Sequence, residues 1–219
     1  MRLLYIACDY SYFLSTDKMY TLLSGLYKHL TQKEEFFVLI LGLDNAGKTT
    51  FLESAKTRLT PNYKGTNLSK ITTTVGMNLG KIDTNGVRLN FWDLGGQEEL
   101  QALWDKYYAE CHAVIYVVDS GDRERVDESK ETFDRMIKNE NIRGVPLLVA
   151  ANKQDLADCM GVREVKPLFE SNTEELGCRE VMVLATSGLT GDGVEEGIDW
   201  VAQCVVRNVG VRPPHEATR

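Results

Sequence analysis

Hydrophobic and polar positions along most of the chain follow two alternating patterns. Short apolar runs that end at polar or glycine-containing segments are typical of buried parallel strands. They occur at Phe36 to Leu41, Val87 to Trp92, Ala113 to Asp119, Pro146 to Ala151 and Val181 to Ala185. Stretches with helical spacing lie between them, at Lys48 to Leu59, Arg125 to Asn139 and Val194 to Val206. The repeated strand–helix order predicts an α/β fold with a doubly wound, mostly parallel sheet.

One pair of strands is predicted to be antiparallel. The apolar run Val75 to Ile82 is joined to Val87 to Trp92 by Asp83-Thr84-Asn85-Gly86, and Asn-Gly is a strong signal for a tight hairpin turn. This hairpin adds an antiparallel edge, so we expect a sheet of six strands.

The N-terminal region has a different pattern. The spacing of one helix face is found at Met19, Leu22, Leu23, Leu26, Tyr27 and Leu30. A helix of roughly 18 Å is too short to span a bilayer but can lie in its interface, and a helix packed permanently on the domain is the alternative. We therefore expect a disordered leader at 1–18, an amphipathic helix at 19–33, the main domain at 34–209 and a flexible tail at 210–219.

Composition narrows the possible functions. The 219 residues are 43% hydrophobic and 26% charged, which is typical of a globular domain with one core. The formal net charge of -7 argues against nucleic-acid binding, which needs a basic surface. The five cysteines lie far apart, which favours reduced thiols in the cytoplasm over a zinc site. No apolar run reaches the ~20 residues of a transmembrane helix.

A glycine-rich segment follows the first predicted strand and precedes the first helix. It reads Gly42-Leu43-Asp44-Asn45-Ala46-Gly47-Lys48-Thr49, which matches the P-loop pattern, and Thr50 follows it. In this context backbone N–H groups and the positive end of the helix face phosphates. We expect Lys48 to contact the β- and γ-phosphates and the Thr49 hydroxyl to bind Mg²⁺. A capped glycine turn that binds no ligand is the alternative.

A second motif closes the strand Val87 to Trp92. It reads Asp93-Leu94-Gly95-Gly96-Gln97 and places Asp93 at the carboxyl edge of the sheet, beside the metal. Gly95 and Gly96 let the chain approach the γ-phosphate, so that a backbone N–H can donate a hydrogen bond to it only while that phosphate is present. Gln97 is the candidate catalytic residue, and we expect it to orient the attacking water because an amide has no useful proton affinity.

A third motif, Asn152-Lys153-Gln154-Asp155, follows the strand Pro146 to Ala151. An ionised Asp155 only accepts hydrogen bonds. Guanine offers N1–H and an exocyclic amine side by side, whereas adenine does not, so this motif favours GTP over ATP. It therefore disfavours a P-loop kinase or ATPase. A module that holds GTP without cycling remains a second alternative.

Together these segments resemble the signature of small GTPases. Gly42 to Thr50 and Trp92 to Gln97 are similar to the Arf and Arf-like branch in particular, and the resemblance covers Met19 to about Pro214. It implies a P-loop small GTPase fold and a switch that binds GTP, GDP and Mg²⁺. It also implies that Thr74 binds the metal together with Thr49 and Asp93.

The last guanine-contacting segment of this family can be placed in two ways. Counted back from Gly191-Asp192-Gly193 it is Ser187-Gly188-Leu189, although Ala185-Thr186-Ser187 can be aligned instead. We take Ser187 and Gly188 as the candidates.

The resemblance also implies partners. Hydrolysis should be slow until an activating protein supplies an arginine, because Arg58, Arg88 and Arg123 are expected to be solvated. An exchange factor and effectors complete the cycle. Neither Met1 nor Met19 is followed by the glycine that myristoylation needs, so membrane binding through the N-terminal helix is expected to use a Golgi receptor. The protein is then a monomer, peripheral on Golgi and trans-Golgi membranes in its GTP state, that acts in vesicle trafficking.

Overall fold

The computed structural model describes residues 33–171 and 173–215. The expected leader at 1–18 and amphipathic helix at 19–33 therefore lie outside the described residues, apart from Lys33, as does 216–219 of the expected tail.

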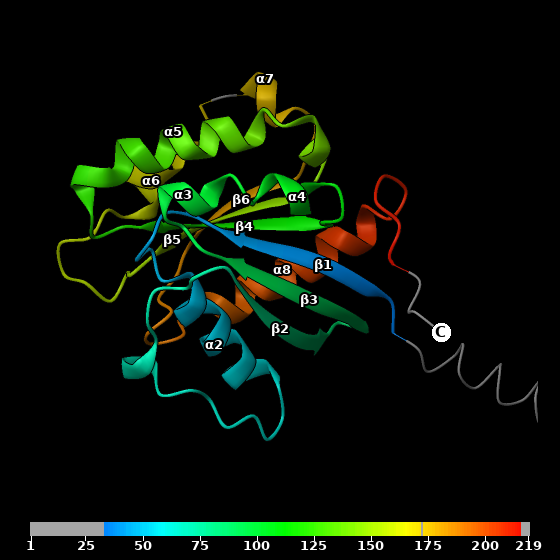
Figure 1. Cartoon of the computed structure of the whole chain (residues 1–219), viewed down its shortest axis with the longest axis horizontal. Helices are drawn as coiled ribbons and strands as arrows, with labels where there is room; N and C mark the ends of the chain where they lie inside the picture. The colour runs from blue at the N-terminus through cyan, green and yellow to red at the C-terminus, as the bar shows by residue number, and fades with distance from the viewer. Residues whose placement is uncertain (1–32, 172, 216–219) are drawn as a thin grey trace, which may run out of the picture. The chain divides into compact units, whose positions relative to one another are not determined.

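The described chain forms one six-stranded sheet in the order β2-β3-β1-β4-β5-β6 (Figure 1). The strands are β1 (Glu35–Leu41), β2 (Met77–Thr84), β3 (Val87–Leu94), β4 (Ala113–Asp119), β5 (Leu147–Asn152) and β6 (Val181–Ala185). β2 pairs antiparallel with β3, and the other neighbouring strands pair in parallel. The predicted α/β sheet with one antiparallel edge is confirmed.

The hairpin has the predicted turn. Thr84 pairs with Val87, and Asn85 and Gly86 both have positive φ, at 49° and 80°, as a tight hairpin turn requires. β2 begins at Met77 rather than at Val75, because Gly76 has a φ of 90°, which is incompatible with an extended strand.

Helices cover both faces of the sheet (Figure 1). They are α2 (Lys48–Leu59), α3 (Glu98–Gln101), α4 (Asp105–Tyr108), α5 (Val126–Ile137), α6 (Val162–Phe169), α7 (Thr173–Leu176) and α8 (Val194–Arg207). α2 and α8 pack on one face, while α3 to α6 lie on the other. The sequence analysis singled out only α2, α5 and α8, because the remaining helices are too short to show a clear period.

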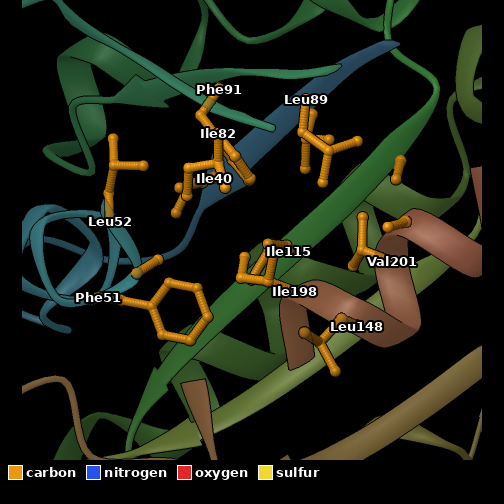
Figure 2. Close-up of a cluster of buried hydrophobic side chains, with 14 of the residues drawn as sticks. Ile40, Phe51, Leu52, Ile82, Leu89, Phe91, Ile115, Leu148, Ile198 and Val201 are labelled. Atoms are coloured by element: carbon orange, nitrogen blue, oxygen red, sulfur yellow. The ribbon is translucent and has the colours of Figure 1, made fainter. Parts of the chain in front are cut away.

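The two faces of β1 show why its apolar run is continuous. Val38 and Ile40 join the hydrophobic cluster under α2 and α8, which Figure 2 shows in part. Leu39 and Leu41 point to the opposite face and join the cluster under α4, α5 and α6. Because both faces are buried, the strand has no polar alternation.

The parallel strands bring the three motifs to one edge of the sheet. The P-loop follows β1, the Asp93 motif ends β3, and the Asn152 motif ends β5. Since the carboxyl ends of parallel strands meet at the same edge, the fold itself assembles the candidate site.

The start of the expected flexible tail contacts the domain. The Arg212 side chain donates to the Ala109 carbonyl (2.6 Å), the Pro213 carbonyl bonds His112 Nε2 (3.0 Å), and His215 N–H donates to the Glu35 carbonyl (3.1 Å). These contacts give residues 211–215 a defined path along the domain, which composition does not reveal. Within 33–171 and 173–215, no helix is both long and apolar enough to cross a bilayer.

Candidate functional site

The P-loop takes a backbone shape that needs its glycines. Gly42 and Gly47 have φ of 138° and 93°, and Asn45 lies at 58°. A Cβ on Gly42 would lie 2.2 Å from the Val117 carbonyl oxygen, so a side chain cannot fit there. The loop leads into the N-terminus of α2, whose free N–H groups and positive dipole favour an anion.

Lys48 reaches back over this loop. Its Nζ donates to the carbonyls of Gly42 (2.9 Å) and Leu43 (2.6 Å). Burial lowers the pKa of Lys48 to about 8, against the raising effect of Asp93 and Asp44. The ammonium group is thus held inside the loop as a positive charge at neutral pH.

Three oxygen-bearing side chains meet beside Lys48. The Thr49 hydroxyl donates to Asp93 Oδ2 (2.6 Å) and lies 2.8 Å from the Thr74 hydroxyl. They come from the start of α2, from the loop before β2 and from β3. Thr74 and Asp93 are 25 and 44 positions from Thr49 in the chain, yet the three residues assigned to the metal lie together in the fold.

The cluster has the chemistry of a Mg²⁺ site. Asp93 is fully buried, and its Oδ1 has no hydrogen-bond partner among the described residues. Burial raises the pKa of Asp93, although the Thr49 hydrogen bond and the charge of Lys48 act to lower it. Two hydroxyls and a buried carboxylate are hard oxygen ligands of the kind that Mg²⁺ accepts, and a cation there would satisfy the unpaired oxygen.

A cavity of about 390 Å³ lies over the P-loop and this cluster. Its lining residues are Asp44, Asn45, Gly47, Lys48, Thr49, Thr50, Leu68, Ile71, Thr72, Thr73, Thr74 and Gly96. The cavity therefore joins the P-loop to the segment before β2 and to the glycine after β3. Its size and its positive floor suit a small phosphorylated ligand.

The segment after β3 lies directly on the P-loop. A Cβ on Gly96 would be 2.3 Å from the Gly42 carbonyl oxygen and 2.5 Å from Asp44 N, so this position requires glycine. Gln97 follows at the N-terminus of α3 and is half-buried. Gln97 directly follows Gly96, which lines the cavity, but Gln97 itself is not among the lining residues, so its role in orienting water stays a prediction.

The third motif joins three loops through one side chain. Asn152 is 2% exposed; its Nδ2 donates to the Ala46 carbonyl (2.8 Å), and its Oδ1 accepts the Gly188 N–H (2.9 Å). Asp155 is exposed and accepts a hydrogen bond from the Ser187 hydroxyl (2.5 Å). A carboxylate at the surface, held by a buried framework, can receive a base from outside.

The other two members of this motif face the protein. Lys153, at a φ of 65°, pairs with Asp119 at 2.6 Å, and the Gln154 side chain donates to the Met160 carbonyl. They hold the loop in shape.

Ser187 belongs to both placements of the last segment, and it contacts Asp155. Both neighbouring residues contact Asn152: Gly188 through its N–H (2.9 Å) and Thr186 through its hydroxyl (3.4 Å). Ala185 is the last residue of β6, and Thr186 is fully buried behind it.

Three of the candidate residues belong mainly to the hydrophobic core. Leu43 is 4% exposed, Ala46 lies in the cluster under α2 and α8, and Leu94 lies in the cluster on the opposite face. Their contribution to a ligand site is through their backbone.

One charged contact of the P-loop was missed by the sequence analysis. Arg125 donates to Asp44 Oδ1 (3.0 Å) and to Asp122 Oδ2 (2.7 Å). Arg58 bonds the Thr190 carbonyl, Arg88 pairs with Asp83, and Arg123 pairs with Glu164. No sequence motif marks Arg125, since the contact joins residues 81 positions apart.

Known proteins share this sequence and fold. A model described as the ADP-ribosylation factor family matches residues 22–205. The chain is 61% identical to ADP-ribosylation factor-related protein 1 of Homo sapiens and of Bos taurus, over 90% of this chain and 98% of each relative. It is 46% identical to ADP-ribosylation factor-like protein 3 of Saccharomyces cerevisiae, with the same coverage. The solved small GTPase Arl6 BBS3 from Trypanosoma brucei, with bound nucleotide analogue GppNp, superposes with a TM-score of 0.68 at 33% identity, covering 79% of this chain and 98% of that one.

Proposed function

Because the chain belongs to the ADP-ribosylation factor family, we propose that it is a GTP/GDP switch that recruits effectors at Golgi and trans-Golgi membranes in vesicle trafficking. As an Arf-like small GTPase it binds guanine nucleotide and hydrolyses GTP. The observation that carries the proposal is the meeting of Thr74 and Gly96, from two separate loops, at one cavity over the P-loop. A third phosphate in that cavity can contact both loops at once.

Mg²⁺ is the metal that we assign to Thr49, Thr74 and Asp93. Held by these three residues, Mg²⁺ would supply positive charge next to the phosphates. Lys48 adds a fixed positive charge, and Gln97, the residue after Gly96, is proposed to orient the attacking water. Thr74 contributes a ligand only when its loop is closed over the cavity, so the nucleotide state and the loop conformation are coupled.

Hydrolysis by the chain alone is proposed to be slow. Arg125 is the arginine next to the P-loop, and its guanidinium is already paired with Asp44 and Asp122. An activating protein that supplies an arginine raises kcat by about 10³ to 10⁵ in enzymes of this type. An exchange factor is proposed to accelerate the release of GDP, so that GTP can bind again.

Exposed apolar side chains support effector recruitment. Val75, Met77 and Leu79 lie on or beside the edge strand β2, and Val75 is 84% exposed. They follow Thr74 directly in the chain. An apolar surface next to a nucleotide-sensing loop is suited to a partner that binds one state only.

Membrane binding is assigned to the apolar face at Met19 to Leu30, which lies outside the described residues. A single short amphipathic helix binds lipid marginally, and stable anchoring needs a second signal. A Golgi membrane receptor is proposed as the second signal, with the protein acting as a monomer.

The bound nucleotide tests the nucleotide part of the proposal. We expect denatured, purified protein to release GDP or GTP at about one per chain, measured by chromatography. Release of ADP or ATP would contradict the reading of Asp155. If no nucleotide is released, titration of labelled GDP with and without Mg²⁺ decides whether the site binds guanine nucleotide at all.

Truncation tests the membrane part. Protein that starts at residue 34 should keep nucleotide binding but lose GTP-dependent association with Golgi membranes in a flotation assay, because it lacks the apolar face. Protein that starts at Met19 is the matched control and should still associate. Equal association of both truncated forms would exclude the helix as the anchor.

A further inference from the structure

Three of the four backbone polar groups of Gly95 and Gly96 have hydrogen-bond partners in the protein. Gly95 N–H donates to the Gly76 carbonyl (2.9 Å), Trp104 Nε1–H donates to the Gly95 carbonyl (3.0 Å), and the Gln101 side chain donates to the Gly96 carbonyl (3.2 Å). Both glycines are buried. Within the described part of the chain, the Gly96 N–H alone among these four groups makes no hydrogen bond.

A single peptide plane links Trp104 to that free N–H. The Gly95 carbonyl and the Gly96 N–H belong to the same planar unit, and they point in opposite directions when the bond is trans, as all described peptide bonds are. Fixing the carbonyl on Trp104 therefore fixes the N–H on the opposite side. Gly96 lines the 390 Å³ cavity and lies against the backbone of Gly42 and Asp44.

From this geometry we infer that Trp104 is a positioning residue for γ-phosphate recognition, with Gln101 in a supporting role. Two consecutive glycines have large conformational freedom, so an unanchored plane could rotate and turn the N–H away from the cavity. The inference rests on the proposed function, since it concerns the nucleotide that the cavity binds.

The anchor itself is held firmly. Trp104 is 2% exposed and packs in the hydrophobic cluster with Leu94 and Tyr108. An indole N–H is only a donor, so a buried tryptophan needs an acceptor, and the Gly95 carbonyl is the one it has.

The supporting residue connects the glycines to α5. Gln101 Oε1 accepts a hydrogen bond from Arg135 (3.2 Å) while its amide nitrogen holds the Gly96 carbonyl. Asn139, also next to α5, donates to Asp105 of α4 (3.3 Å). The loop that reads the phosphate is thus tied to a helix that lies outside the nucleotide site (Figure 1).

The experiment compares two nucleotides that differ only at the γ-phosphate. Dissociation constants for GDP and for a non-hydrolysable GTP analogue are measured with Mg²⁺ on the full chain and on Trp104→Phe, which keeps an aromatic ring but loses the N–H. We expect affinity for the analogue to fall about fivefold, the effect of one misplaced hydrogen bond, with GDP affinity unchanged. Trp200→Phe on α8 is the matched control and should change neither value.

A second variant covers the case in which Trp104→Phe does not fold. Gln101 is half-buried, and methionine has a similar shape. Gln101→Met removes the hydrogen bond to the Gly96 carbonyl and leaves Trp104 unchanged. It should weaken binding of the analogue selectively, by a smaller factor. Equal loss for both nucleotides, or an unchanged ratio in the folded variants, would overturn the inference. Failure of the unaltered chain to bind either nucleotide would instead reject the proposed function and the inference with it.

Discussion

Single polar side chains decide how the candidate base-binding edge is built. Asn152 ties the P-loop to the loop after β6, Gln154 bonds Met160, and only Asp155 of this motif faces outward at the surface. The sequence predicted that these residues belong to one site. It could not separate framework from ligand-facing groups, because burial of a loop residue depends on which other loops pack against it.

Asp155→Asn tests the outward-facing group. The amide has one acceptor and one donor, so it can accept from only one of the two guanine donors and places its own NH₂ opposite the other. We expect GDP affinity to fall by about 10²-fold or more, and the xanthine analogue, which has a carbonyl in place of the amine, to bind relatively better.

Competition of labelled GDP by GDP and by the xanthine diphosphate measures this change of preference. Asp158→Asn, in the same exposed loop, is the control and should bind both as the original chain does. An unaltered preference in Asp155→Asn would show that another group reads the base.

At the scale of elements, local sequence patterns predicted the segments that are long or that carry a turn-forming residue. Each strand was anticipated from its apolar run, and the hairpin from Asn85-Gly86. α3, α4 and α7 have four residues each, and α6 contains Pro167 within eight, so none of them carries a readable helical period. These helices form because tertiary packing holds them, and α3 and α4 flank Trp104.

Gly86→Ala tests the hairpin. Gly86 has a φ of 80° with nothing within 4 Å of the position of a Cβ, so the cost is the backbone conformation alone. We expect the free energy of unfolding to fall by about 1 kcal/mol in urea titration. Gly210→Ala also enters open space, but at an ordinary φ, and should have little effect. Comparable losses in the two variants would argue against backbone strain as the cause.

At the scale of the whole molecule, the C-terminal segment 211–215 contacts the first strand, β1. His112 is almost fully buried, accepts the Phe37 N–H on Nδ1 (3.0 Å) and bonds the Pro213 carbonyl through Nε2 (3.0 Å). The neutral ring satisfies both partners with one proton, on Nε2. Contacts between residues 101 positions apart thus fix where residues 211–215 run.

Acidification should weaken this contact. Burial lowers the pKa of His112 below its usual 6.5, and His215 and Arg212 act in the same direction against the Pro213 hydrogen bond. A depressed pKa means that the unfolded chain binds the proton more readily. The stabilisation by His112 is therefore complete above pH 6.5 and is lost as the pH falls through the folded-state pKa.

Urea titration between pH 7.5 and 5 measures this effect. The free energy of unfolding should fall more steeply for the original chain than for His112→Asn, which does not titrate in this range. His215→Ala keeps His112 and should retain most of the slope. Parallel curves for His112→Asn and the original chain would refute the assignment.

The sequence by itself determined the succession of the six strands along the chain, the three long helices α2, α5 and α8, the hairpin turn and the three motifs, because periodic burial and special backbone conformations leave local patterns. The resemblance to a family had already implied that Thr74 and Thr49 share a metal, and the structure places their hydroxyls 2.8 Å apart. Only the tertiary structure decided that Arg125 meets Asp44 and that Trp104 meets the Gly95 carbonyl. The Arg125 contact crosses 81 positions, and the Trp104 contact joins a loop to a side chain that core packing orients. Local pattern carries no information on such contacts, since they depend on how the elements pack against one another.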